Sequence, residues 1–311
     1  MTEANVVASS LGERAAYQLA NVTKTAPQYR AITPRWTVRF LDWKPVESGV
    51  LRVNRVAEEK TVDVVCGPAG IDGLPETFVN YEESPREYTL SSISALLDVP
   101  TRISDLFSSP FDQVKEQLRL TVEAVKEKQE SELINNADYG LLRNVASSQR
   151  IQTRSGPPTP DDLDELISKV WKEPSFFLAH PRAIAAFERE CTRRGVPPPT
   201  VTLFGSPFLT WRGLPLVPTD KLFVDGETNP AGEGGKTNIL LLRVGEKKQG
   251  VIGLFQPGLP GEQTPGLSVR FMGVDRRAIA SYLVSLYCSA AVLTDDAIAA
   301  LENVEVGSYH D

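Results

Sequence analysis

The sequence predicts an α+β fold in which a compact lobe carries several parts that extend away from it. Three observations indicate this: a long polar hairpin, one long half-polar helix, and a segment where helices and strands follow one another closely. The chain has 311 residues, 41% of them hydrophobic and 23% charged, so it can bury a substantial core. Its net charge of −7 argues against a surface built mainly to bind nucleic-acid phosphates.

Residues 1–35 predict an N-terminal arm. Ser10 and Glu13 form a capping box ahead of a short amphipathic helix. Pro27 and Pro34 then favour extended backbone. The segment is more apolar than a free tail requires, so we expect it to dock on another surface.

The packed part begins at residues 36–43, and residues 50–95 predict a long β-hairpin. Apolar and polar residues alternate at 51–53 and again at 88–92, which is typical of strands. The glycine-rich sequence at 67–73 marks a turn between them. The hairpin has little core of its own, so we expect it to stand away from the body.

A spine helix is predicted from about Phe111 to Asn136. Pro110 lies near its first turn, a position that tolerates proline. Apolar residues recur at helical spacing from Val114 to Val125. About 26 residues at 1.5 Å each give a rod of roughly 39 Å, against which other elements can lie.

A compact α/β segment follows the proline-rich joint at 156–160. Two helices are predicted, one ending near Trp171 and one over 181–194. We expect the segments 238–244 and 251–255 to pair, and a last helix at 297–301. Strand patterns occur at 201–204, 208–211, 214–217, 222–224, 238–244, 251–255 and 268–272.

Motifs for catalysis, metal binding and cofactor binding are missing from the sequence, which predicts a protein that is not an enzyme. The chain has two histidines, and Cys66, Cys191 and Cys288 lie far apart with no CxxC pair. The GGKT sequence at 234–237 lacks the P-loop spacing, because Pro230 stands where a glycine is required.

No signal sequence is visible, and the longest apolar stretch, 279–293, is shorter than the ~20 residues of a membrane-spanning helix. The sequence therefore predicts a cytoplasmic protein without a membrane partner.

Long, unusual strings in the chain resemble the family 2A encapsulin shell proteins. They cover residues from about 14 to 305 and include PTPDDLDELISKVWKEPSFFLAHP, RRGVPPPTVTLFG and LFQPGLPGEQTPGLSVRFMG. Family 2B members carry an inserted cyclic-nucleotide-binding domain, which this sequence lacks. The resemblance implies the major capsid fold of the Hong Kong 97 (HK97) type.

In that fold the chain divides into an N-arm, an E-loop, a peripheral P-domain and an axial A-domain. The implied bounds are 1–35 for the N-arm and 50–97 for the E-loop. The P-domain would comprise 36–49 and 98–154, with its spine helix at 108–137. Residues 155–275 would form most of the A-domain, and 276–311 the return through both domains and the tail.

The resemblance also implies an icosahedral nanocompartment of T=1 symmetry, a 60-mer that assembles itself and encloses a cargo enzyme. For family 2A that cargo is expected to be a cysteine desulfurase of sulfur metabolism. No cofactor, metal or nucleic acid is expected to bind the shell protein.

Pores at the symmetry axes would control the passage of small molecules. We expect the loop after the helix over 181–194 to line the fivefold pore, because three prolines would hold a ring rigid and arginines would attract anions. A glycine-rich loop at 229–237 is the rival lining. The predicted pore residues are Arg193, Arg194, Gly195, Val196, Pro197, Pro198, Pro199 and Thr200.

Two alternatives remain open from the sequence. A major capsid protein of a tailed phage would share the fold, although a genome container favours a basic interior. A stand-alone α/β enzyme would form a small oligomer instead of a particle in the megadalton range.

Overall fold

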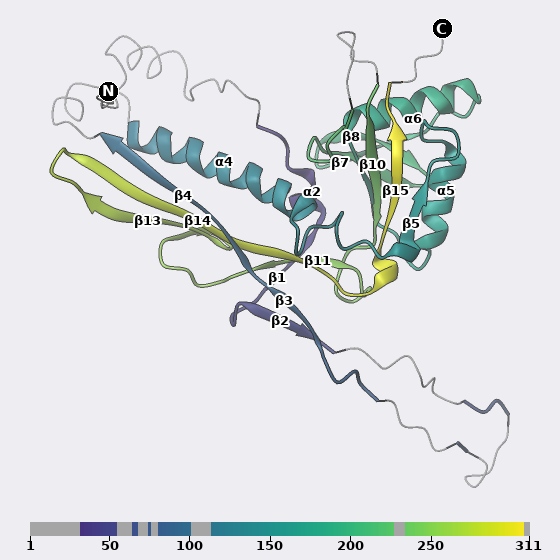
Figure 1. The fold of residues 1–311 in the computed structure, drawn as a ribbon, viewed down its shortest axis with the longest axis horizontal. Coiled ribbons are helices and arrows are strands. Elements are labelled where there is room, and N and C mark those ends of the chain that lie inside the picture. Colours follow the sequence, from purple (N-terminus) through teal and green to yellow (C-terminus); the bar gives the residue numbers. More distant parts are fainter. Residues whose placement is uncertain are drawn as a thin grey trace.

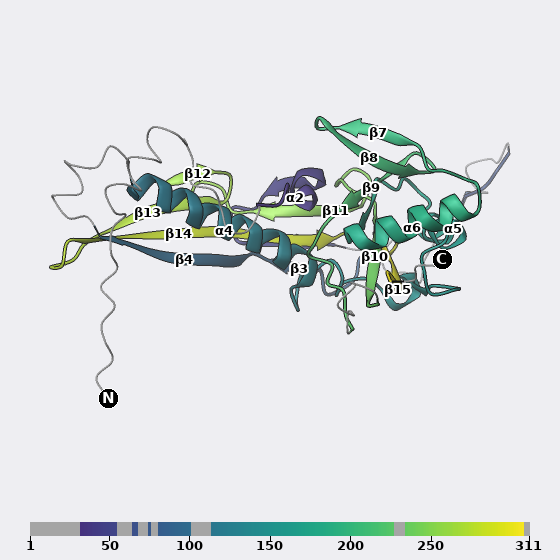
Figure 2. The same cartoon turned by 90° about the horizontal axis from the view of Figure 1, so that it is seen from above.

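A computed structural model describes residues 32–54, 64–67, 74–75, 80–100, 113–226 and 234–307. These residues form an elongated lobe and a compact lobe, each built on its own β-sheet (Figure 1). Seen from above, the two lobes lie in line along the long axis of the molecule (Figure 2).

The elongated lobe contains a six-stranded sheet centred on β14. This strand pairs with β13 and then β11 along one edge and with β4 along the other. The apolar stretch near the C-terminus is therefore a long central strand. The strands are β1 (Asp42–Pro45), β4 (Ser91–Pro100), β11 (Val251–Phe255), β12 (Glu262–Thr264), β13 (Leu267–Val274) and β14 (Ile279–Val292).

The predicted spine helix is observed as α4 (Gln113–Asn135), and residues 108–112 lie outside the described part of the chain. It runs along the sheet beside β4 and β14 (Figure 1). Leu118, Val122 and Val125 pack onto sheet residues that include Val284. Burying this apolar side explains why a helix with so many charged residues remains attached.

Three glutamates of α4 hold the chain that leads into the fold. Their spacing places them on one face of the helix. The residues they bind alternate along the segment 33–37, which runs into α2 (Trp36–Phe40). The bonds are Arg35 Nη1 to Glu123 at 2.5 Å, Thr33 N to Glu127 at 2.9 Å and Thr37 N to Glu130 at 2.9 Å.

The compact lobe contains a seven-stranded sheet in the order β5-β15-β10-β6-β9-β8-β7. Alternate residues of β6 face opposite sides: Phe177 packs with the helices α5 (Pro160–Lys169) and α6 (Pro181–Arg193), and Phe176 packs toward α2. The strands are β5 (Arg150–Gln152), β6 (Phe176–Ala179), β7 (Thr200–Leu203), β8 (Ser206–Trp211), β9 (Leu214–Pro218), β10 (Lys236–Leu242) and β15 (Ile298–Glu305).

Both helices of this lobe begin at the caps that the sequence indicates. In α5 (Pro160–Lys169), Thr159 and Asp162 form a capping box. In α6 (Pro181–Arg193), His180 Nδ1 accepts a hydrogen bond from the backbone of Arg182. His180 is a helix cap, and its burial lowers the pKa of the imidazole.

The expected pairing of 238–244 with 251–255 is wrong. β10 lies between β15 and β6, whereas β11 lies between β1 and β14 in the other sheet. The residues between the two strands carry the chain from one lobe to the other. At this crossing Gly250 lies so close to the Arg243 carbonyl that a Cβ atom would be 2.3 Å from its oxygen.

The expected helix at 297–301 is also wrong, because these residues lead into strand β15. Only Asp295–Ala297 forms a short 3-10 turn. Residues Ile298 to Leu301 are all fully buried, as the centre of a sheet covered on both faces requires. The expected strand at 222–224 is not formed either, and a single bridge joins Asp225 to Lys236 there.

The predicted hairpin is confirmed at its base, where β2 (Val50–Val53) pairs antiparallel with β3 (Arg86–Thr89). Most of its distal part, like residues 1–31, lies outside the described residues. The domain bounds remain a prediction. Strands β11, β12 and β13 belong to the sheet that packs on α4, whereas β15 belongs to the sheet that packs on α5 and α6.

Candidate assembly surfaces and pore loop

An aromatic cluster joins the two lobes. Trp36 and Phe40 come from α2, and the ring of Trp36 lies 5.0 Å from that of Phe208. Phe40 lies 4.9 Å from Phe176 and 5.2 Å from Phe204. Because α2 is bound to α4 of the elongated lobe and the other rings belong to the compact lobe, the cluster helps to fix the angle between the lobes.

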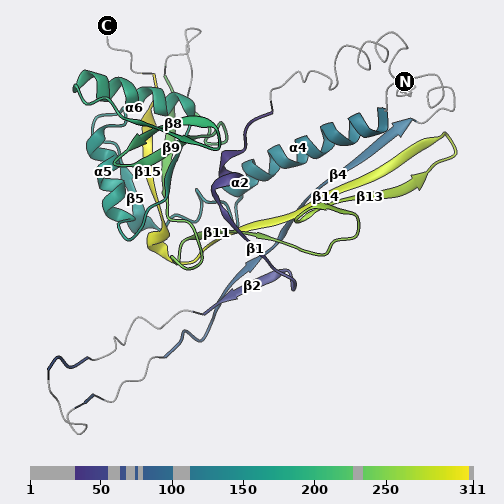
Figure 3. The ribbon, with the colours of Figure 1, turned by 180° about the vertical axis from the view of Figure 1, so that it is seen from behind.

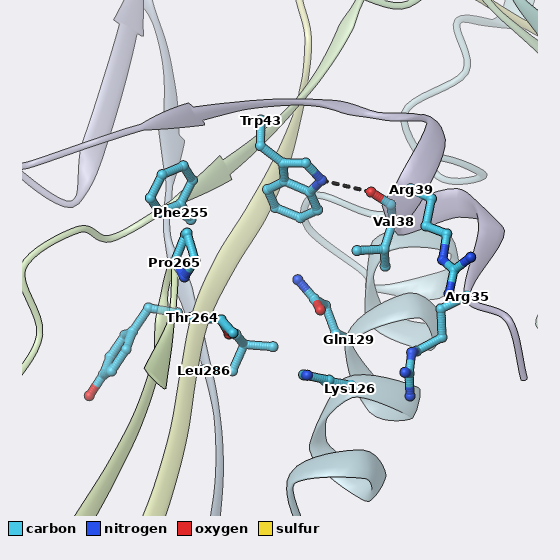
Figure 4. Close-up of a pocket in the computed structure, with 11 residues that line it drawn as sticks. Arg35, Val38, Arg39, Trp43, Lys126, Gln129, Phe255, Thr264, Pro265 and Leu286 are labelled. Carbon is cyan, nitrogen blue, oxygen red and sulfur yellow. Dashed lines mark hydrogen bonds between the residues drawn. The ribbon is translucent and has the colours of Figure 1, made fainter. Parts of the chain in front are cut away.

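A pocket of about 400 Å³ lies between α2, α4 and the six-stranded sheet (Figure 4). Trp43 forms part of its apolar wall, and its indole Nε1 donates to Val38 O at 2.8 Å. The three charged lining residues are all cations, Arg35, Arg39 and Lys126. Two of these cations already have partners outside the pocket: Arg35 forms an ion pair with Glu123 of α4, and the Arg39 guanidinium lies over the Trp36 ring.

The predicted pore loop is an exposed connection between α6 and β7. Gly195 has φ +70°, in the left-handed region that favours glycine after a helix. Val196 is 49% exposed, and its N–H donates to Cys191 O at 2.9 Å. The loop ends where Pro199 O accepts from Thr210 N, so both of its ends are fixed.

The two arginines of this loop are bound by carboxylates of the same lobe. Arg193 Nη2 donates to both oxygens of Glu190, at 2.5 and 2.6 Å. Arg194 Nη1 donates to Asp161 at 2.9 Å, which links α6 to α5. The positive charge expected to attract anions is therefore largely compensated. The rival loop at 229–237 lies mostly outside the described residues.

Exposed large apolar side chains gather at two ends of the described chain. Leu96, Phe271, Met272 and Val274 lie near the β13–β14 turn, each more than half exposed. Val64, Val65, Leu74 and Tyr81 lie beyond the base of the hairpin. Patches of this kind commonly mark protein–protein contacts.

The described residues contain no arrangement suited to catalysis. None of their His, Cys, Asp and Glu side chains form a group of three that could hold a metal. Burial raises the pKa of Cys288 to about 12 and that of Cys191 to about 11, so both thiols stay protonated and unreactive. No described helix is long and apolar enough to span a membrane.

Comparison with known proteins identifies the family. A model of the type 2A encapsulin shell protein, SrpI-like, matches residues 49–308. The type 2A encapsulin shell protein SrpI of Synechococcus elongatus is 64% identical over 97% of this chain and 96% of its own length. This chain belongs to the type 2A encapsulin shell proteins.

Further relatives agree with this encapsulin assignment. A type 2A encapsulin shell protein of Mycolicibacterium paratuberculosis is 58% identical over 100% of this chain and 99% of its own length. The cryo-EM structure of the holo-SrpI encapsulin complex from Synechococcus elongatus has 61% identity and a TM-score of 0.82, covering 97% of this chain and 99% of that one.

The fold is the HK97-type capsid fold. The capsid of a native GTA particle aligns over 92% of this chain and 98% of its own with a TM-score of 0.59, at 13% identity. The predicted family and fold are confirmed, and so is the prediction that the protein is not an enzyme. The encapsulin shell protein forms a nanocompartment, which excludes the stand-alone enzyme and the phage capsid alternatives.

Proposed function

We propose that this encapsulin shell protein builds a T=1 shell of 60 copies that encloses a cysteine desulfurase for sulfur metabolism in the bacterial cytoplasm. The observation that carries the proposal is the match to a holo complex along nearly the whole chain, at a TM-score of 0.82. The free cysteines at 66, 191 and 288 suit a reducing compartment.

Electron microscopy of the purified protein tests the stoichiometry. A 60-mer of 34.1 kDa subunits should appear as uniform hollow particles in the megadalton range. Co-expression with a cysteine desulfurase should give particles that retain the enzyme through size-exclusion chromatography. Particles of a larger symmetry class would contradict the T=1 proposal, and a desulfurase that elutes separately would contradict the cargo proposal.

We also propose that the loop from Arg193 to Thr200 lines the fivefold pore. Support comes from its exposure, from its anchored ends and from the three prolines that stiffen it. Val196 is the sharpest place to test it, because the flanking arginines are bound to Glu190 and Asp161.

Replacing Val196 with aspartate should slow the entry of anions several-fold, because symmetry would bring five carboxylates into one ring. Shells filled with a fluorescent protein allow entry to be followed by iodide quenching. Val196→Asn serves as the uncharged control, and acrylamide as the neutral quencher. Equal iodide rates in the two variants would show that Val196 does not line the conducting pore.

A further inference from the structure

The pocket between α2, α4 and the six-stranded sheet has an apolar side and a cationic side. Figure 3 shows α2 at the end of α4 that is next to the compact lobe, close to β1 and β11. In Figure 4 the sheet contributes Trp43, Phe255 and Leu286, whose side chains form the apolar side. Helix α4 and the chain around α2 contribute the three cations. No described aspartate or glutamate lines this pocket.

The apolar side is held in place by the fold itself. Gly253 faces Trp43 across the β1–β11 pair, and a Cβ atom at Gly253 would lie 2.7, 2.7 and 2.9 Å from three atoms of the indole. The glycine therefore lets the face of the ring rest on β11, while the indole N–H bond to α2 fixes its rotation. Pro265 closes the wall beside Tyr287, whose N–H donates to Gly266 O at 2.9 Å. A site with ordered walls loses less free energy when a ligand binds.

Two of the three cations have no carboxylate partner. Glu123 of α4 offsets the charge of Arg35 at 2.5 Å. Lys126 and Arg39 form no ion pair with any residue in the described part of the chain. The Arg39 guanidinium lies over the Trp36 ring, which attracts the cation but does not cancel its charge. Like charges in one wall repel each other, and an anion bound between them removes that repulsion.

The size and the lining of the pocket together define a class of ligand. Its volume of about 400 Å³ falls within the range of about 300–1,000 Å³ that small-molecule sites occupy. An aromatic body would cover Trp43 and Leu286, and a carboxylate or sulfonate would compensate the charges of Lys126 and Arg39. Gln129, which is 8% exposed, also lines the pocket and offers its amide to the polar part of a ligand. A neutral molecule would leave the cations without a counter-charge, and a fully polar anion would leave the apolar side uncovered.

We propose that this pocket binds a small organic anion with an aromatic body and one carboxylate or sulfonate group. The body packs on the ring of Trp43, and the anionic group lies against Lys126 and Arg39. The site is complete within one subunit, so the proposal goes beyond the function proposed above and depends on neither the 60-mer nor the cargo.

Dansylglycine and dansylamide test the proposal on assembled shells, because they share one fluorescent aromatic body and only dansylglycine carries a carboxylate. Fluorescence titration of the wild type should show that dansylglycine binds roughly tenfold more tightly than dansylamide, since a charge-assisted contact is lost in the amide. Lys126→Gln with Arg39→Gln should weaken dansylglycine binding by about the same factor and leave dansylamide binding almost unchanged. Thr264 is an exposed residue of the lining, and Thr264→Trp should fill the pocket and weaken the binding of both probes.

Lys128→Gln with Arg143→Gln is the matched control, because both cations are exposed and neither lines the pocket. It should bind both probes like the wild type, and light scattering checks that every variant assembles. Equal binding of the two probes to the wild type, or unchanged dansylglycine binding in the Lys126 and Arg39 variant, would overturn the proposal and indicate an apolar docking site for a protein segment. Dansylglycine binding that persists in Thr264→Trp would place the site elsewhere and would overturn it as well. Probe affinity decides this inference and particle diameter decides the T=1 proposal, so the two can fail separately.

Discussion

Replacing Asp296 with asparagine is expected to destabilise the protein by about 3–5 kcal/mol, because it leaves a buried guanidinium without its carboxylate. The side chain of Arg243 is 1% exposed, and its Nη2 donates to Asp296 Oδ1 at 2.8 Å. Arg243 follows β10, where the chain crosses between lobes, and Asp296 lies in the turn before β15. The pair therefore links the connection from β10 to β11 with the connection from β14 to β15, and both connections run between the two sheets.

This pair also makes stability depend on pH. Burial alone would raise the pKa of Asp296, but hydrogen bonds from Arg243 and Lys172 outweigh it and lower the pKa far below its usual range. A carboxyl whose pKa is lower in the folded state stabilises the fold above its unfolded pKa. That stabilisation is lost as the pH falls toward the folded pKa. The Asp296→Asn variant should therefore lose less stability than the wild type between neutral and acid pH.

Thermal unfolding of the assembled shell measures the effect, with an expected fall in melting temperature of about 5–10 °C. Asp295→Asn is the control, because Asp295 is more than half exposed and its pair with Arg86 spans 3.4 Å. Exposed pairs contribute ~1 kcal/mol or less. If Asp296→Asn and Asp295→Asn lowered the melting temperature equally, the burial of Arg243 would not explain the contribution of Asp296 to stability.

Local signals in the sequence predicted α4, α5 and α6 well. The starts of α5 and α6 depend on caps within a few residues, such as Thr159 with Asp162, so short-range chemistry determines them. The extent of α4 followed from apolar spacing that the sheet then covers. The family assignment came from long strings of sequence and not from these local signals.

Pairing between distant strands could not be predicted in the same way. The segments that became β10 and β11 are both apolar, and nothing in their own residues reveals that they belong to different sheets. The residues at 297–301 carry a helix-start signal at Asp295 and Asp296, yet tertiary burial on both faces makes them a strand. In both cases contacts far along the chain outweighed local preference.

The candidate pore loop also combines features that local sequence predicts with contacts that only the fold determines. The position of the loop around Val196 followed from its prolines, but the pairing of Arg194 with Asp161, 33 residues earlier, depends on how α6 packs beside α5.

Trp36→Ala is expected to cost about 3–5 kcal/mol, as large truncations in buried clusters do. The Trp36 side chain is 7% exposed and its ring meets Phe208 of the compact lobe nearly perpendicularly, at 76°. It also begins α2 and lies within the segment bound by the glutamates of α4. One truncation therefore removes packing between lobes at the point where the entering chain is anchored.

Thermal unfolding followed by fluorescence can measure this loss, with Trp171→Ala as a matched control. Trp171 is 69% exposed, and its truncation should change stability by no more than about 0.5 kcal/mol. Trp36→Phe keeps a ring in the cluster and should recover part of the loss. Because the aromatic cluster fixes the angle between lobes, Trp36→Ala should also give fewer or irregular particles. Regular shells with an unchanged melting temperature would show that the angle is held elsewhere, for instance by the Arg243–Asp296 pair at the neighbouring crossing.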